Sequence, residues 1–188
     1  MSPILRPLFA TLIVTAVVFS AFVPRPGIAS SAGEIDNNVD KAIADLYSQS
    51  SEAKALAVRA KGILVFPKII KGGLIVGAQA GEGALRVNGK TAGYYNTVAV
   101  SYGLQAGVQW FGYAMYFMND SALKYLDESD GWEVGVGPSI VVVEEGFASS
   151  ATTTSLKDDI YVFFFKQKGL MAGLGLQGTK ITKITPDE

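Results

Sequence analysis

Hydrophobic residues recur at helical spacing near the start of the chain and then change to the alternating spacing of β-strands. In the segment 34–60, four apolar residues follow one another at three- and four-residue steps with charged residues between them: Ile35, Val39, Ile43 and Leu46. This pattern predicts an amphipathic helix. Ser50 and Ser51 are typical helix caps, and they predict a second helix over residues 52–60 that Gly62 ends.

Beyond Gly62, short apolar runs separated by turn residues predict a succession of strands. Asn88-Gly89 indicates a two-residue hairpin turn. Asn119 predicts the cap of a short helix. Residues 98–110 predict one continuous strand whose apolar face consists of Val98, Val100, Tyr102, Leu104, Ala106, Val108 and Trp110. Other strands are expected over residues 113–118, 133–143, 160–165, 170–176 and 180–184, with a long connection over 148–159.

Glycines form a weak internal repeat in the predicted strands. Three copies of the pattern Gly-Leu-x-x-Gly begin at Gly73, Gly103 and Gly169, and a further glycine pair lies at Gly135 and Gly137. Glycine weakens a strand, so its recurrence on one face needs a reason. The pattern favours tight coiling of a closed or nearly closed sheet. A shallow trough in which a ligand or partner approaches the backbone is the alternative.

The N-terminus has the pattern of a secretory signal. Residues 8–23 form an uncharged run that follows Arg6 and precedes prolines and small residues. This predicts a signal peptide over residues 1–29, cleaved after Ala29 or as late as Ala32, and an exported mature chain. An uncleaved membrane anchor is the alternative.

The composition fits one sheet-rich domain over residues 34–188. Of the 188 residues, 49% are hydrophobic and 21 are glycines. The absence of His and Cys excludes imidazole bases, His-activated nucleophiles, thiolate metal sites and disulfides. With 16 basic and 17 acidic side chains, the chain has no positive excess for binding nucleic acid.

No pattern predicts catalysis, a cofactor or a metal. The carboxylate pairs Glu144-Glu145 and Asp158-Asp159 have no separation that sequence can define, whereas glycosidase chemistry needs a definite one. Asp127 and Asp130 lack the ligand spacing of a calcium loop. We therefore expect a protein that is not an enzyme.

One segment has the charge expected of a membrane-binding surface. Residues 53–81 contain no acidic residue and five basic ones, Lys54, Arg59, Lys61, Lys68 and Lys71, beside the apolar residues 63–66, 69 and 70. Each such charge near an anionic bilayer contributes about 1 kcal/mol. Trp110 and Phe111 are candidates for an additional apolar contact with the interface. A solvated surface with no ligand is the alternative for the basic residues, and ordinary core packing is the alternative for the aromatic ones.

Five strings in order resemble the SYLF domain, over about residues 40–184: Ala60-Lys61-Gly62-Ile63-Leu64-Val65-Phe66-Pro67, Gly93-Tyr94-Tyr95-Asn96, Ser101-Tyr102-Gly103-Leu104-Gln105-Ala106-Gly107, Gly131-Trp132-Glu133-Val134-Gly135 and Lys168-Gly169-Leu170-Met171-Ala172-Gly173. The resemblance implies a lipid-binding module, because eukaryotic relatives bind phosphoinositides and some bind actin. It also implies that Lys61, Lys68 and Lys71 match the lipid-contact region of the family.

The pattern and the resemblance together predict an α+β fold, with N-terminal helices packed on a curved, barrel-like, mainly antiparallel sheet. The expected function is non-enzymatic, peripheral binding of anionic phospholipid head groups by an exported, periplasmic or envelope protein. The alternative is an envelope protein-interaction module whose glycine-rich strands receive a partner segment. We expect no nucleic-acid partner.

Overall fold

The computed structural model describes most of the predicted domain. Its described residues are 30–73, 76–102, 107–129, 131–143, 157–169, 176 and 178–187. The predicted signal peptide, the predicted strand over 170–176 except Leu176, and most of the connection over 148–159 lie outside the described residues.

Three helices begin at side-chain caps. The Ser31 hydroxyl accepts a hydrogen bond from the Glu34 amide at 3.3 Å and begins α2 (Ala32–Gln49). Ser50 ends α2 and also begins α3 (Ser51–Ala57), accepting from the Ala53 amide at 3.1 Å. Asn119 caps α4 (Asp120–Glu128) in the same way. The structure therefore confirms all three predicted helices, although the second ends earlier than expected.

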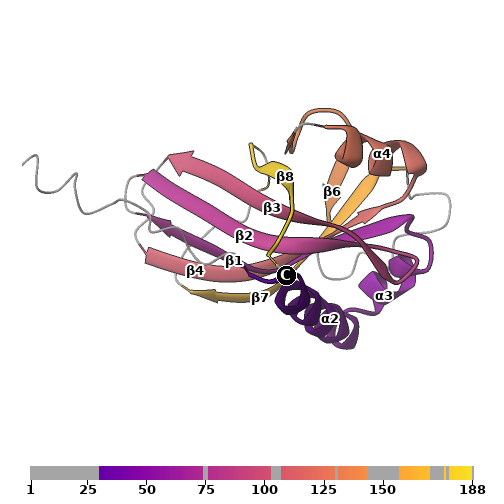
Figure 1. Ribbon diagram of the computed structural model, residues 1–188, viewed down its shortest axis with the longest axis horizontal. Helices are drawn as coiled ribbons and strands as arrows, with labels where there is room; N and C mark the ends of the chain where they lie inside the picture. Colours follow the sequence, from indigo (N-terminus) through magenta and orange to yellow (C-terminus); the bar gives the residue numbers. More distant parts are fainter. Residues whose placement is uncertain are drawn as a thin grey trace, which may run out of the picture.

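Eight strands form one curled sheet in the order β5-β8-β3-β2-β1-β4-β7-β6 (Figure 1). Neighbouring strands are antiparallel, except for β6 and β7, which are parallel. The predicted α+β fold with a curved, barrel-like, mainly antiparallel sheet is thus confirmed as a half-barrel. The strands are β1 (Gly62–Gly73), β2 (Val76–Val87), β3 (Lys90–Tyr102), β4 (Gly107–Phe117), β5 (Trp132–Glu133), β6 (Ile140–Val142), β7 (Ile160–Gly169) and β8 (Lys180–Ile184).

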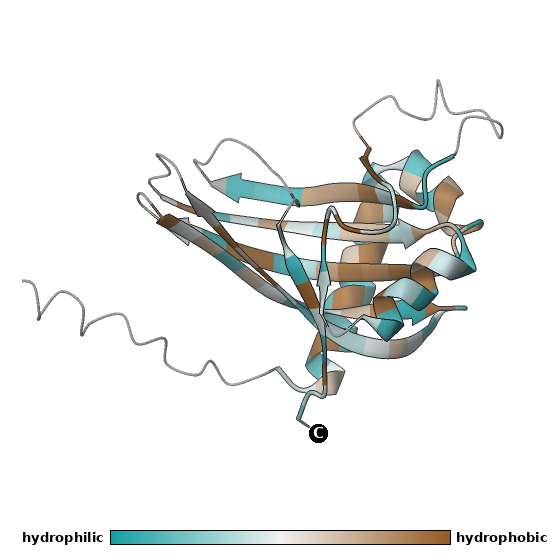
Figure 2. Cartoon of the chain, turned by 90° about the horizontal axis from the view of Figure 1, so that it is seen from above, coloured by the Kyte–Doolittle hydropathy of each residue, from teal (hydrophilic) through white to brown (hydrophobic). Residues whose placement is uncertain are grey.

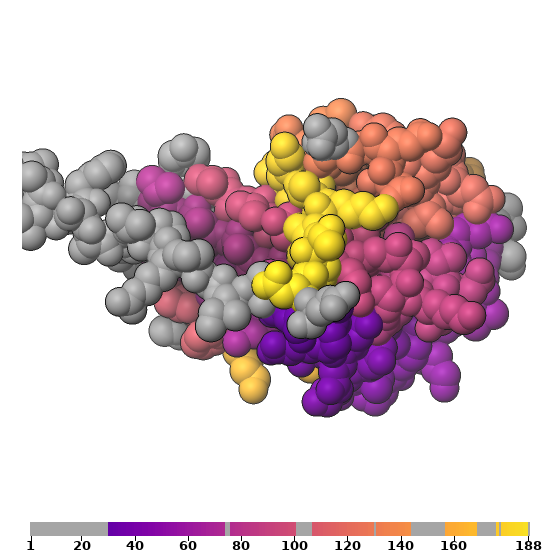
Figure 3. Space-filling model, in the orientation of Figure 1, coloured from indigo at the N-terminus to yellow at the C-terminus, as the bar shows by residue number. Residues whose placement is uncertain are grey.

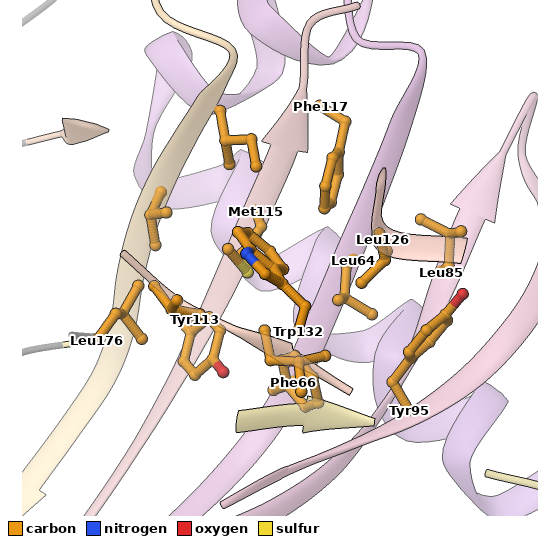
Figure 4. Close-up of a cluster of buried hydrophobic side chains, with 14 of the residues drawn as sticks. Leu64, Phe66, Leu85, Tyr95, Tyr113, Met115, Phe117, Leu126, Trp132 and Leu176 are labelled. Carbon is orange, nitrogen blue, oxygen red and sulfur yellow. The ribbon is translucent and has the colours of Figure 1, made fainter. Parts of the chain in front are cut away.

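The inner face of the half-barrel holds the larger hydrophobic cluster. Side chains from six other strands and from α4 belong to the same cluster as Trp132 (Figure 4). Trp132 is 2% exposed, and its ring centroid lies 6.2 Å from that of Phe117. The indole N–H of Trp132 donates to the carbonyl of Val136 at 2.9 Å, so this buried N–H group has a hydrogen-bond partner. Ala122 and Leu126 of α4, the helix at one end of the curled sheet in Figure 1, belong to this cluster.

The outer face is covered by α2 over only part of its length. Ile35, Val39, Ala42 and Leu46 on α2 pack against strand residues that include Val65 and Tyr116. Figure 1 shows β1, β2, β3, β4 and β7 extending beyond both α2 and α4. Figure 2 shows apolar segments (brown) on the strands beside the helices and again toward the ends that the helices do not cover.

An arginine on the sheet holds α2 in place. The Arg86 guanidinium donates to the Asp36 carboxylate at 2.8 Å, to the Asp36 carbonyl at 3.2 Å and to the Asp40 carboxylate at 2.6 Å. Thr91 and Tyr94 also donate to the Asp36 carboxylate. The C-terminal segment adds a contact, because the Ala32 amide donates to the Asp187 carbonyl at 3.1 Å. Figure 3 shows this segment (yellow) lying over β3, between α2 (indigo) and the residues around α4 (orange).

β1 contains one extra residue where it passes β2 and β4. Its register shifts between Val65 and Ile70 against β2, and between Phe66 and Ile69 against β4. A Cβ added at Gly83 would lie 2.1 Å from the Val65 carbonyl oxygen, and one at Gly81 would lie 2.6 Å from the Lys68 carbonyl oxygen. Gly81 and Gly83 therefore leave room for the bulge of β1 against β2. This use of glycine agrees with the prediction that the glycines permit tight coiling of the sheet.

Two strand predictions are wrong. The single strand expected over residues 98–110 is two strands, since β3 ends at Tyr102 and β4 begins at Gly107. The strand expected over 133–143 is the short strands β5 and β6 joined by turns, because Gly135 and Gly137 have φ values of 107° and 90° that a strand does not allow. The hairpin at Asn88-Gly89 is confirmed, with φ values of 52° and 75°.

Candidate functional site

The five basic residues predicted to form one surface are spread over the molecule. Lys54 and Arg59 lie on α3 and just after it, and Lys61 precedes β1, with its ammonium 4.0 Å from the Asp120 carboxylate. Lys68 is exposed in the β1 bulge. Lys71 is only 9% exposed. The prediction of one continuous basic surface is therefore wrong.

The β1 bulge explains the position of Lys71. Leu64 and Phe66 belong to the inner cluster, so a regular strand would place even-numbered residues on the inner face and Lys71 on the outer face. The extra residue shifts this alternation, and Ile69 joins the inner cluster while Ile70 becomes 48% exposed. Lys71 then lies beside Gln79 and Gln109 on the neighbouring strands, which are also buried.

The two aromatic candidates point to opposite faces of β4. Trp110 is 43% exposed on the outer face, as an interface residue would be. Phe111 is 2% exposed, with its ring centroid 5.8 Å from Phe164 and 6.5 Å from Tyr113. Because Phe111 is part of the inner core, its prediction as a membrane contact is wrong.

Beyond the end of α2, the outer face carries a group of exposed apolar side chains that we call the outer patch. One row across the sheet pairs Val98 with Ala80, Ala80 with Ile70, and Ile70 with Trp110. The next row pairs Val100 with Ala78 and places Val108 beside Gly72. Large apolar residues at this end of the sheet are between 43% and 57% exposed: Ile70, Val76, Val98, Val100, Val108 and Trp110. A contiguous group of this kind is typical of an interaction site.

The α2 groove lies between the start of α2 and the outer patch. It has a volume of about 820 Å³, within the range of small-molecule sites. Its floor includes Ile70, Ala80 and Val98, so it opens directly onto the outer patch. Its polar lining consists of Ser30, Glu34, Asn38, Lys41, Lys68, Glu82, Asn96, Thr97 and Lys166.

Two lysines that line this groove lie in strand bulges. Lys68 comes from the bulge in β1, and Lys166 comes from a second bulge in β7, where its φ of 54° is in the left-handed region. Between them, Gly112 on β4 makes room for the Phe165 ring, which a Cβ would meet at 2.4 Å. The Lys166 ammonium lies 2.5 Å from the Asp45 carboxylate.

Within the described residues, no group of three or more Asp or Glu side chains is placed to hold a metal ion. The Asp159 carboxylate accepts from the Ser139 amide and hydroxyl and from the Asn119 amide, and these bonds hold its pKa below the usual range. Burial raises the pKa of Tyr113 well above its ordinary value, so this phenol stays protonated and bonded to Thr97 at 2.8 Å. Glu144-Glu145 lies outside the described residues.

Sequence reasoning missed the outer patch as a site, together with Lys41 and Lys166. The alternation over residues 98–110 predicted an apolar strand face, but it did not show that part of this face is exposed. Residues of the Gly-Leu-x-x-Gly repeats lie at paired positions of neighbouring strands. Gly73 pairs with both Gly77 and Gly107, and Gly169 pairs with Gln109. The repeats therefore gather at one end of the sheet, beside the outer patch.

Fold and site define the protein as an α+β half-barrel module with an apolar, lysine-bordered surface. Residues 98–186 match the model of the family Ysc84, described as Las17-binding protein actin regulator. This match agrees with the resemblance to the SYLF domain seen in the sequence motifs. No curated protein matches the chain. Within the described residues, no helix has the length and apolar character needed to cross a bilayer.

Proposed function

We propose that the protein is an exported, non-enzymatic module that binds peripherally to phospholipid membranes through the outer patch. The exposed apolar side chains of this patch, with lysines at its border, are the observation that supports the proposal. Trp110 pairs with Lys168 on β7, so an aromatic and a basic residue occupy neighbouring strand positions at the edge of the patch. Such a pair suits a membrane interface, where apolar and anionic groups meet.

Electrostatic attraction and burial of apolar surface should both contribute to membrane binding. Lys41, Lys68 and Lys168 would contribute about 3 kcal/mol together if all three faced an anionic bilayer. Each 100 Å² of apolar surface that leaves water would add roughly 2.5 kcal/mol. Binding should therefore weaken with salt but persist in part, because the apolar contribution is not screened.

The alternative of a glycine-rich docking face has less support. The space above Gly81 and Gly83 is filled by β1, and the space above Gly112 is filled by Phe165. At these positions the glycines serve packing between strands, whereas a Cβ at Gly107 would meet nothing within 4 Å.

The first experiment is sedimentation with vesicles of phosphatidylglycerol mixed with phosphatidylethanolamine. We expect Val108→Ser combined with Trp110→Ser to weaken binding at least about tenfold, since exposed apolar side chains contribute on the order of 1 kcal/mol or more each when buried. Val58→Ser is the matched control, because Val58 is 87% exposed after α3 and away from the patch. Equal sedimentation of both variants and the wild type, or no sedimentation of the wild type at low salt, would refute the proposal.

A second experiment compares the two ends of the molecule. Lys68→Glu combined with Lys168→Glu should weaken vesicle binding, whereas Lys54→Glu combined with Arg59→Glu should change it little. A larger loss from the second pair would place the membrane contact at α3 and contradict the assignment to the outer patch.

A further inference from the structure

The α2 groove and the outer patch form one continuous surface with a polar end and an apolar end. Ile70, Ala80 and Val98 belong to both, as floor of the groove and as the first row of the patch. From Ala80 to Val76 the patch continues along β2 for roughly 13 Å, at 3.3 Å per residue. A molecule with its polar part in the groove could thus lay an apolar chain over the exposed strands.

The charges in the groove are mixed and nearly balanced. Lys166 is held by Asp45, whereas Lys41 and Lys68 have no ion-pair partner within the described part of the chain. Glu34 and Glu82 supply two carboxylates to the same lining. A purely anionic ligand would meet these carboxylates as like charges, which is unfavourable.

The charged side chains of the groove come from α2, from β2 and from the bulge in β1. Glu34, Asn38 and Lys41 are spaced four and three residues apart on α2, so they share one side of the helix. Glu82 lies on β2, opposite Asn96, and one of its oxygens accepts from the Ser30 amide at 3.3 Å. Lys68 faces them from the β1 bulge. Two cations and two carboxylates in one groove complement a ligand that carries one phosphate and one ammonium group.

We propose that the α2 groove holds a single phospholipid whose head group joins a phosphate to an ammonium. Lys41 and Lys68 bind the phosphate, Glu34 and Glu82 bind the ammonium, and one acyl chain lies over the outer patch. This inference rests on the proposed function, since it names the lipid class and the binding mode at the same surface. It goes further because it requires binding of one lipid molecule in solution, with no bilayer present.

The chain contains its own reporter for this test. It has two tryptophans, of which Trp132 is buried in the inner cluster and Trp110 is exposed in the patch. An acyl chain that covers Trp110 should shift its fluorescence to shorter wavelength. The probe is lysophosphatidylethanolamine held below its critical micelle concentration. Lysophosphatidic acid of the same chain length lacks the ammonium, and glycerophosphoethanolamine lacks the chain.

We expect saturable binding of lysophosphatidylethanolamine, at least about tenfold tighter than that of either comparison compound. Lys68→Gln and Glu82→Gln should each weaken it about tenfold, while the exposed control variants Lys90→Gln and Glu133→Gln leave it unchanged. Equal or tighter binding of lysophosphatidic acid, or no effect of Glu82→Gln, would overturn the assignment of the head group. An absence of monomer binding while the wild type still sediments with vesicles would overturn the single-lipid site and leave the proposed function standing. If the wild type neither binds the lipid monomer nor sediments with vesicles, both the single-lipid site and the proposed function are overturned.

Discussion

Removal of the Arg86 side-chain charge should loosen α2 from the sheet and lower the free energy of unfolding by about 2–3 kcal/mol. The Arg86 side chain is 10% exposed, and its two ion pairs reach Asp36 and Asp40, which are 34% and 69% exposed. A hydrogen bond to a charged partner contributes about 1.5–3 kcal/mol when it is sheltered, and an exposed pair contributes less than about 1 kcal/mol. Asp36 keeps its bonds from Thr91 and Tyr94 in an Arg86→Met variant, so no carboxylate is left without a donor.

Urea denaturation followed by circular dichroism measures this loss, with an unchanged m-value as the sign that the same surface unfolds. Lys124→Met is the matched control, since Lys124 pairs with Glu128 at 3.4 Å on the surface of α4 with both side chains more than 60% exposed. It should cost less than about 0.5 kcal/mol. If Arg86→Met costs no more than Lys124→Met, the network does not hold α2 in the way that its geometry indicates.

Two further predictions concern stability. Gly83→Ala should destabilise the fold by about 1–3 kcal/mol, because the added Cβ would meet the Val65 carbonyl oxygen. Gly33→Ala should raise the free energy of unfolding by up to about 1 kcal/mol, because Gly33 lies on α2 with open space around it. If urea denaturation gives effects of the same sign for both variants, the packing argument is contradicted. Because hydrogen bonds lower the pKa of Asp159, its stabilising effect is present above the unfolded pKa near 4 and is lost as pH falls through the folded pKa. Thermal unfolding between about pH 5 and pH 2 should therefore depend less on pH in Asp159→Asn than in the wild type, and identical profiles would show that the carboxylate is not responsible.

Local signals in the sequence predicted the helices and the tight turn well. Ser50 acts as a cap whatever the rest of the fold does, because its hydroxyl needs only the amide three residues along the chain. Asn88-Gly89 adopts positive φ values for an equally local reason. The motifs quoted from β1 to β7 likewise led to the SYLF family, to which the match over residues 98–186 corresponds.

The candidate site was predicted only in part. Of the residues predicted to contact lipid, Lys68 and Trp110 are exposed, whereas Lys71 and Phe111 are buried. Pro67, which has no backbone N–H to donate, is a local signal for a bulge, and it lies between Phe66 and Ile69, where the register of β1 shifts. The sequence did not show that this shift turns Lys71 to the inner face, because that depends on how β1 pairs with β2 and β4.

The sequence by itself determined where helices begin, where strands alternate and which chemistry is absent, since these depend on neighbours along the chain or on residue types. The tertiary structure decided which side of each strand meets water. α2 is too short to cover the outer face, so the alternating apolar residues of β3 and β4 pack under a helix at one end of the sheet and stay exposed at the other. Whether a helix covers a given part of a sheet depends on the lengths of both elements and on their positions in space, so no local pattern of residues predicts it.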